Sequence, residues 1–241
     1  MSRAAVIIPT YQRGHMLADA LASLDAQDEP CEVYVYDDGS TDDTAEIALA
    51  HGACYTRASH GGSVTLARNA AVSWALQITR APYIAMLDSD DAYASDAVRR
   101  RADALDTGTC DMVFSGIRFC RAPLFAKREG LDRHIDISRY APGDFDSFDR
   151  NVHTATVMMH RDLWIPWREE IRLGGADLLW VYEQVTRGLR VGYVDASLYY
   201  LRKHDGRNIT RWRGTDDEVR QAERRVYRRL VREIREEHGY G

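Results

Sequence analysis

Short apolar runs alternate with helix-like stretches over the first part of the chain. Residues 4–9 (AAVIIP) and 82–87 (PYIAML) are almost continuously apolar, which is typical of strands buried on both faces of a parallel sheet. Residues 14–27 carry apolar side chains at the three- and four-residue spacing of an amphipathic helix. Repeated units of this kind predict an α/β fold with a doubly wound, mostly parallel sheet and right-handed crossovers.

Two further strands and two further helices complete this part. Residues 32–36 (EVYVY) and 53–58 (ACYTRA) have the composition of strands. The polar turn 37–44 (DDGSTDDT) supplies capping residues for a helix that ends at Gly52, and a second helix is predicted over 64–79. Four strands alternating with three helices are therefore expected before the acidic segment at residue 88.

The pattern changes after about residue 110. The segment 121–150 is polar and is predicted to be a loop. Elsewhere, the apolar periodicity predicts strands over 111–119, 154–160 and 190–194 and helices over 176–188 and 215–237. Three tryptophans of this region fit core packing better than an acceptor pocket; they are Trp164, Trp167 and Trp180. No internal repeat or low-complexity linker divides the chain, which favours one continuous domain with a C-terminal tail.

Composition and charge restrict the class of protein. The 241 residues are 45% hydrophobic and 29% charged, which is ordinary for a globular protein. A formal net charge of −5 gives the whole chain no electrostatic reason to bind nucleic acid. The four cysteines form no C-x-x-C pair and predict a reduced, cytoplasmic protein. No apolar run approaches the roughly 20 residues of a membrane span, so any membrane association is expected to be peripheral.

Polar residues follow three of the predicted strands at their carboxyl ends. They are Thr10–Tyr11, Asp37–Asp38 and the acidic cluster 88–91 (DSDD). Ligands of open α/β sheets bind outside the carboxyl ends of the strands, so these positions predict one site. The aromatic ring of Tyr11 could stack on a nucleobase, and Asp37 or Asp38 could accept hydrogen bonds from base or ribose. The alternative is that each segment is only a turn with locally favoured Asp, Gly and Ser.

The acidic cluster has the chemistry of a cation site. Asp88 and Asp90 are spaced i, i+2 after a buried strand, and carboxylate oxygens are the ligands that Mg²⁺ or Mn²⁺ prefer. Adjacent carboxylates repel one another, and a cation would remove that cost. The alternative is a solvated acidic turn in which Asp91 caps a helix.

Four motifs in this order resemble the family 2 glycosyltransferases of the GT-A fold. They are VIIPTYQR, VYDDGSTDDT, ARNAAVSWA and YIAMLDSDD. The resemblance is close over 4–93 and looser to about residue 210. It implies a GT-A domain over 1–210, with a nucleotide-sugar-binding half (1–110) and an acceptor-binding half (111–210), and a charged C-terminal helix over 211–241.

The resemblance also implies roles for individual residues. The nucleotide-sugar donor would be bound by Pro9, Thr10, Tyr11, Arg13, Asp37, Asp38, Arg68, Asp88, Ser89, Asp90 and Arg202. A divalent cation, Mn²⁺ or Mg²⁺, would be held by Asp88 and Asp90, with Asp91 able to replace either, and by His204. In the segment YYLRKHDGRNIT, Arg202 would approach the diphosphate.

The catalytic base implied by the family is an aspartate that opens a helix in the second half, usually after a glutamate. The matching stretch is GGADLLW, so Asp177 is the candidate and Ala176 departs from the pattern. The implied reaction transfers a sugar from a nucleotide donor, expected to be UDP-linked, to an acceptor hydroxyl with inversion. The alternative is that Asp177 is only an N-terminal helix residue whose negative charge is favoured by the helix dipole.

Other functions remain open at this level. A donor-binding scaffold that has lost its base would fit the departure at Ala176. A nucleotidyltransferase is less favoured because PTYQRGHM lacks a Gly-rich, Lys-containing loop. The acceptor could be a glycan, a lipid-linked or small molecule or, less favoured, a nucleic acid. The arginine-rich tail is expected to be mostly self-paired with its own acids, and its narrow apolar seam could also support a homodimer.

Overall fold

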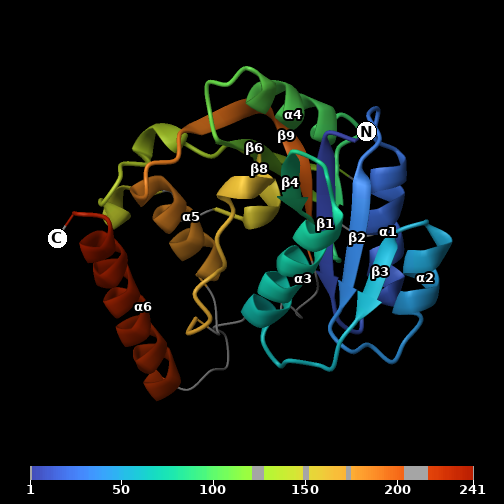
Figure 1. Cartoon of the computed structure of the whole chain (residues 1–241), viewed down its shortest axis with the longest axis horizontal. Helices are drawn as coiled ribbons and strands as arrows, with labels where there is room; N and C mark the ends of the chain where they lie inside the picture. The colour runs from blue at the N-terminus through green and yellow to red at the C-terminus, as the bar shows by residue number, and fades with distance from the viewer. Residues whose placement is uncertain (1, 121–127, 149–151, 172–174, 204–216, 241) are drawn as a thin grey trace.

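One sheet organises the whole chain. The computed structural model describes residues 2–120, 128–148, 152–171, 175–203 and 217–240. Within these ranges the sheet has nine strands in the order β3-β2-β1-β4-β8-β6-β9-β5, with β7 paired to β6 (Figure 1). Among the described helices, none combines the length and the apolar character needed to cross a bilayer.

Four parallel strands form the first half of the sheet. They are β1 (Ala4–Thr10), β2 (Glu32–Asp37), β3 (Cys54–Arg57) and β4 (Tyr83–Met86). β1 lies between β2 and β4, and β3 pairs with the outer edge of β2. The connections are the helices α1 (Gly14–Asp25), α2 (Thr44–Ala50) and α3 (Val64–Ile78). The predicted alternation of strand and helix is confirmed here, and the α/β class with it.

The second half of the sheet is mixed. Its strands are β5 (Ala92–Tyr93), β6 (Met112–Cys120), β7 (Arg128–Arg133), β8 (Val157–His160) and β9 (Val191–Arg202). β8 runs antiparallel to both of its neighbours, β4 and β6, whereas β6 and β9 are parallel. β8 therefore joins the two halves, although the chain reaches it only after β6.

Three sequence predictions for this half are wrong in detail. The segment 121–150 is not loop throughout, because β7 pairs with β6 through Ile117 and Arg133. The strand predicted over 190–194 continues without a break to Arg202. The strand predicted from residue 154 begins as a single 3-10 turn, Thr154–Thr156, and becomes extended only at Val157.

Helices cover both faces of the sheet. Along β1, Ala4, Val6 and Ile8 face one core, and Ala5 and Ile7 face the other. The first core includes buried residues of α1, α2 and α4 (Ala97–Asp106), and the second includes those of α3, α5 (Ala176–Thr186) and α6 (Asp217–Glu237). A strand buried on both faces explains why the first apolar run of the sequence shows no polar alternation.

Trp167 and Trp180 belong to the core, as predicted, and Trp164 packs against it. Trp167 and Trp180 are 2% and 3% exposed and stack with ring centroids 4.9 Å apart. The indole nitrogen of Trp180 donates to the carbonyl of Ile165 at 2.7 Å. These rings fix the position of α5, which carries the candidate base.

Asp42 joins the amino ends of two helices. One carboxylate oxygen accepts from the backbone nitrogen of Gly14 at 3.0 Å, and the other accepts from the nitrogen and hydroxyl of Thr44 at 3.2 and 2.6 Å. Burial would raise the pKa of Asp42, but these hydrogen bonds outweigh it and lower the pKa. The carboxylate thus sets the spacing of α1 and α2 beside the carboxyl ends of β1 and β2.

Asp42→Ala is expected to lower the free energy of unfolding by about 1–2 kcal/mol, because it removes a cap from two helices at once. Urea denaturation at neutral pH measures the change. Asp43→Ala is the matched control, since Asp43 occupies the N-cap of α2 but makes no side-chain cap hydrogen bond. Equal losses in the two variants would contradict this role of Asp42.

Candidate active site

The acidic cluster lies where the sequence predicted, in the turn that follows β4. The backbone nitrogen of Leu87 still bonds to β1 through the carbonyl of Ile7 at 3.0 Å, and the nitrogen of Asp91 closes the turn on the carbonyl of Asp88 at 3.1 Å. Ser89 is 4% exposed within this turn. The cluster is therefore fixed to the centre of the sheet.

Asp91 is the structural member of the cluster. It is 4% exposed, and its carboxylate accepts from the backbone nitrogen of Arg202 at 2.7 Å and from the hydroxyl of Tyr199. These bonds tie the turn to β9. Burial raises the pKa of Asp91 well above its usual range, and the charges of Asp90 and Asp88 raise it further.

The raised pKa of Asp91 predicts a pH dependence of stability. Above its ordinary value near 4, the unfolded chain has released a proton that the folded Asp91 still holds, so stability falls as the pH rises toward the folded pKa. Asp91→Asn is expected to reduce this fall. Melting temperatures between about pH 4.5 and 8 in EDTA measure it. An unchanged slope in the variant, relative to Asp162→Asn on the surface, would contradict the assignment.

Asp88 and Asp90 are the more accessible carboxylates of the cluster. Their side chains are 29% and 14% exposed, and each is neutralised by an arginine. Arg68 donates to Asp88 at 3.1 Å, and Arg13, at the N-cap of α1, forms an ion pair with Asp90. Both carboxylates are thus partly buried and each is balanced by a positive charge. A divalent cation fits this donor set of hard oxygens.

The two aspartates after β2 have different surroundings. Asp37 is 1% exposed and accepts from the backbone nitrogen of Ser40 and from the hydroxyl of Tyr55, both at 2.7 Å. Asp38 points to the loop before α3, where it accepts from the ring of His60 at 2.6 Å and the nitrogen of Gly61 at 3.0 Å. Asp37 therefore shapes the turn, and Asp38 holds the neighbouring loop.

His60 is a site residue that the sequence analysis missed. Its ring stacks on Tyr11 with a centroid distance of 3.9 Å and an interplanar angle of 8°. Gly39 makes room for this loop: its φ is +93°, and a Cβ there would lie 2.8 Å from the backbone nitrogen of His60. One face of Tyr11 is thus covered by His60, and Tyr11 as a whole is partly exposed. Pro9 and Thr10 end β1 beside it, and the hydroxyl of Thr10 is buried without a hydrogen-bond partner among the described residues.

Asp177 lies in the first turn of α5, as predicted. Gly175, with a φ of +82°, occupies the N-cap position before it. One carboxylate oxygen of Asp177 accepts from Arg68 at 2.6 Å and from the hydroxyl of Thr154 at 3.1 Å. Thr154 is the second site residue that the sequence analysis missed, because no local pattern connects it with α5.

Arg68 joins the two halves of the site. Its guanidinium donates to Asp177 with one nitrogen and to Asp88 with another, while its side chain is only 11% exposed. Burial alone would lower the pKa of Arg68, but the charges of Asp177 and Asp88 outweigh it and keep the pKa above its ordinary value. The side chain is therefore a permanent cation between the acidic turn and α5.

Arg202 is buried under the acidic turn. It is 8% exposed, and its guanidinium donates to the carbonyl of Asp90 at 2.8 Å and to Asp19 of α1 at 2.6 Å. Arg202 thus links the acidic turn to helix α1. His204, the predicted third metal ligand, lies outside the described residues.

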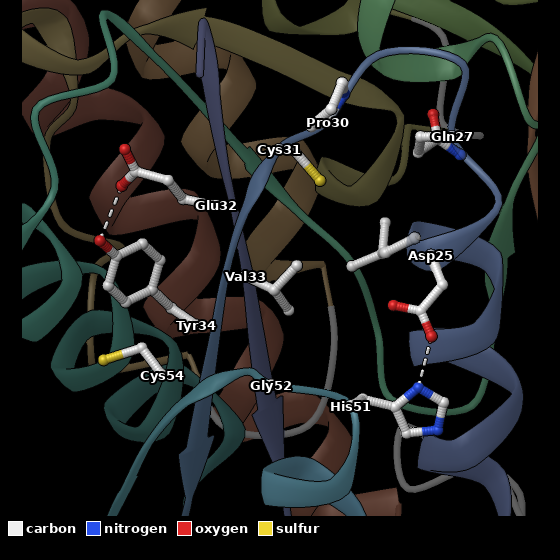
Figure 2. Close-up of a pocket in the computed structure, with 11 residues that line it drawn as sticks. Asp25, Gln27, Pro30, Cys31, Glu32, Val33, Tyr34, His51, Gly52 and Cys54 are labelled. Carbon is white, nitrogen blue, oxygen red and sulfur yellow. Dashed lines mark hydrogen bonds and ion pairs between the residues drawn. The ribbon is translucent and has the colours of Figure 1, made fainter. Parts of the chain in front are cut away.

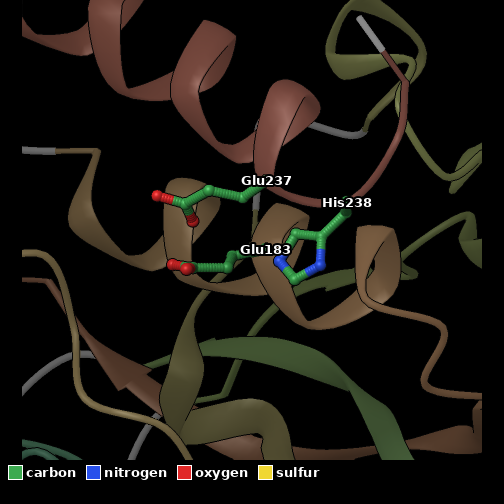
Figure 3. A group of neighbouring side chains, drawn as sticks. All are labelled: Glu183, Glu237 and His238. Atoms are coloured by element: carbon green, nitrogen blue, oxygen red, sulfur yellow. The ribbon is translucent and has the colours of Figure 1, made fainter.

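Two other features lie away from this site. A cavity of about 450 Å³ opens at the amino ends of β2 and β3, where His51 pairs with Asp25 at 2.6 Å (Figure 2). Glu183, Glu237 and His238 come together where α5 meets the end of α6 (Figure 3). Arg168 donates to both of these glutamates, at 2.5 and 2.6 Å, so their charge is already neutralised by the protein.

The fold is shared with solved structures of glycosyltransferases. S. aureus TarS (residues 1–349) in complex with UDP-GlcNAc superimposes with a TM-score of 0.72 at 20% identity, over 95% of this chain and 65% of that one. Mannosyltransferase PcManGT from Pyrobaculum calidifontis, in complex with GDP-Man and Mn²⁺, gives a TM-score of 0.59 at 18% identity, over 88% and 58%. At this level of identity the likeness defines the fold, which is of the GT-A type.

The family model described as Glycosyl transferase family 2 matches residues 5–164. The chain therefore belongs to glycosyl transferase family 2. The succinoglycan biosynthesis protein ExoU of Rhizobium meliloti is 32% identical over 142 residues, which are 57% of this chain and 38% of ExoU. Glycosyltransferase AglJ of Haloferax volcanii is 34% identical over 104 residues, 43% of this chain and 32% of AglJ. The chain thus matches about a third of the length of these relatives.

Proposed function

We propose that the protein transfers a sugar from a nucleotide-sugar donor, UDP-linked, to an acceptor hydroxyl with inversion at the anomeric carbon. One observation carries this proposal: Arg68 contacts Asp88 on one side and Asp177 on the other, at 3.1 and 2.6 Å. The carboxylate suited to a donor-bound cation and the carboxylate suited to a base therefore flank a single side chain. Membership of family 2 supports the reaction class.

The donor would lie across the carboxyl ends of β1 and β2. The face of Tyr11 away from His60 would offer a stacking surface for the base, and the orphan hydroxyl of Thr10 offers a hydrogen-bond group nearby. The carboxylate of Asp38 would accept a hydrogen bond from ribose in addition to those that it already accepts from His60 and Gly61. TarS, which was solved with UDP and with UDP-GlcNAc, gives the higher TM-score of the two neighbours described, and this favours uridine as the base.

The diphosphate would lie over the acidic turn. Asp88 and Asp90 would hold Mn²⁺ or Mg²⁺, and the PcManGT complex contains Mn²⁺. Such an ion would neutralise charge on the departing diphosphate. Arg68 and Arg13 already lie against these two carboxylates, so their guanidinium groups could move to the phosphate oxygens when donor and cation arrive.

Asp177 would remove the acceptor proton. The acceptor oxygen forms a bond to the anomeric carbon, the bond from that carbon to the diphosphate oxygen breaks, and the nucleoside diphosphate leaves with the electron pair. Thr154 holds the carboxylate oxygen that also faces Arg68, which leaves the other oxygen of Asp177 for the acceptor. Arg68 would pair with Asp177 until the donor competes for the guanidinium.

A thermal-shift panel of UDP, GDP, UDP-GlcNAc and GDP-mannose, each with and without Mn²⁺, tests the donor and cation together. A ligand at a hundred times its Kd stabilises the fold by about 2.7 kcal/mol, so a rise of several degrees is expected for the uridine ligands with Mn²⁺. Asp90→Asn is expected to abolish the part that depends on Mn²⁺, while Asp162→Asn should retain it.

The reaction products separate the remaining functions. Release of a nucleoside diphosphate supports glycosyl transfer, and release of pyrophosphate would indicate a nucleotidyltransferase. Donor binding with neither hydrolysis nor transfer would indicate a scaffold. No shift with any nucleotide in the presence of Mn²⁺ would overturn the proposal.

A further inference from the structure

The helix α6 separates charges that the sequence interleaves. Its buried side rests on α5 through Leu230 and Ile234, both 0% exposed. Successive residues of an α-helix are rotated by about 100° around its axis. On α6, one strip of the helix surface about 100° wide carries five arginines and Gln221. From Gln221 to the end of the helix, no acidic residue falls within this strip. We call these five residues the arginine face; they are Arg224, Arg225, Arg228, Arg232 and Arg235. All are exposed.

The arginine face points away from the body of the protein. Figure 1 shows α6 at the end of the molecule opposite α2, with α5 on its inner side. The strip lies roughly opposite Leu230 and Ile234 on the helix, and it extends for about 17 Å along the axis. The expectation that the tail is mostly self-paired holds for Arg229 with Glu233 and for Arg232 with Glu236, but among the described residues it does not extend to the rest of this face.

Several of these arginines have no neutralising neighbour. Within the part of the chain that the structure describes, Arg224, Arg225 and Arg228 form no ion pair, and Arg232 only approaches Glu236 at 4.0 Å. Arg224, Arg228 and Arg232 are spaced i, i+4, an arrangement in which like charges repel and weaken the helix. An external anionic partner would relieve this repulsion.

We propose that the arginine face docks the protein on an anionic phospholipid bilayer. A straight row of guanidinium groups along one exposed helix matches a flat surface of phosphate groups. Arginine binds phosphate through paired N–H groups. A nucleic acid is the less suitable partner, because the arginine face is one short, straight row and the chain as a whole is not basic, with a formal net charge of −5. The proposal concerns location on a surface and does not depend on the reaction proposed above.

Co-sedimentation with vesicles tests this proposal. The full chain is mixed with vesicles of three parts phosphatidylcholine to one part phosphatidylglycerol, or with phosphatidylcholine alone. Binding is expected only to the anionic vesicles, and it should fall steeply between about 0.05 and 0.5 M NaCl because salt screens the exposed charges. Equal binding to both vesicles, or binding to neither, would overturn the proposal.

Two matched variants localise the effect. The triple variant Arg224→Gln, Arg228→Gln, Arg232→Gln is expected to lose about tenfold to a hundredfold in partitioning onto anionic vesicles. The control, Arg80→Gln, Arg139→Gln, Arg190→Gln, removes the same charge from exposed arginines elsewhere and should bind as the wild type does. Equal losses in the two variants would overturn the proposal, because they would reflect net charge alone.

A charge-preserving variant guards against misfolding. Replacing Arg224, Arg228 and Arg232 with Lys should retain most of the partitioning, and the melting temperatures of all variants identify any loss of fold. If the wild type binds a duplex DNA probe more tightly than it binds anionic vesicles, and the triple Gln variant loses that binding, the partner is a nucleic acid and the lipid proposal is wrong. A failure of vesicle binding would not change the interpretation of the donor-binding and product-release experiments.

Discussion

Asp177→Asn is expected to lower the rate of nucleoside diphosphate release by about 10²- to 10⁴-fold, because the variant cannot accept the acceptor proton. The amide oxygen can still accept from Arg68 and Thr154, so the position of α5 should be kept. Hydrolysis of the donor by water provides the readout, since a water molecule can replace the acceptor hydroxyl. Initial rates at saturating donor measure the loss in kcat.

The thermal shift with donor separates catalysis from binding in this variant. The shift should be close to that of the wild type, because in the proposed arrangement Asp177 faces the acceptor and the variant keeps the hydrogen bond to Arg68. Asp162→Asn is the control, since its carboxylate is 90% exposed and lies on the surface. An Asp177→Asn protein with the rate of the wild type would rule out this residue as the base.

Arg68→Met is expected to lower the free energy of unfolding by about 2–3 kcal/mol, because it leaves Asp88 and Asp177 without their shared cation. The figure is at the lower end for a broken buried pair, since these carboxylates are 29% and 20% exposed and water repays part of the loss. Urea denaturation in EDTA measures it. Arg68→Lys should retain part of the stability, because one ammonium group replaces a fork that reaches both partners.

An exposed ion pair provides the control for Arg68. Arg190 pairs with Asp111 at 2.7 Å, and its side chain is 58% exposed, so Arg190→Met should cost much less stability than Arg68→Met. Mn²⁺ adds a second test: it should stabilise Arg68→Met more than it stabilises the wild type, because the ion would neutralise Asp88 in place of the arginine. Equal effects of Mn²⁺ on both proteins would contradict the placement of the cation at Asp88.

The first half of the fold could be predicted from local pattern because its strands and helices alternate in sequence as they do in space. β1 is flanked by β2 and β4, and each crossover contains one helix. The carboxyl ends of these strands therefore had to converge. The convergence of Thr10, Asp37 and Asp88 at one edge followed from strand direction alone.

The second half could not be predicted in the same way because its pairings are distant in sequence. Nothing in the residues of β8 indicates that it inserts between β4 and β6, since the same apolar composition would suit an edge position. Arg68 and Asp177 are separated by 109 residues, so their ion pair depends on how α5 is placed against α3. The motif resemblance implied a role for each residue but not their contact.

His60 and Thr154 show a second limit of sequence patterns. Each contacts predicted site residues: His60 bonds to Asp38 and stacks on Tyr11, and Thr154 donates to Asp177. A lone histidine in a glycine-rich loop and a threonine in a 3-10 turn have many structural uses. The one available signal for His60 was its position beside Gly61; the close approach of Gly39 to the His60 backbone depends on the folded structure.

The late insertion of β8 has a consequence for biosynthesis. Until the ribosome has made Val157–His160, the outer edge of β4 has no partner strand, although the first four strands can already associate. At about 5–20 residues per second this edge stays open for several seconds. An open edge of a hydrophobic strand is a template for aggregation, so nascent or truncated chains that end before residue 157 should be the forms most dependent on chaperones.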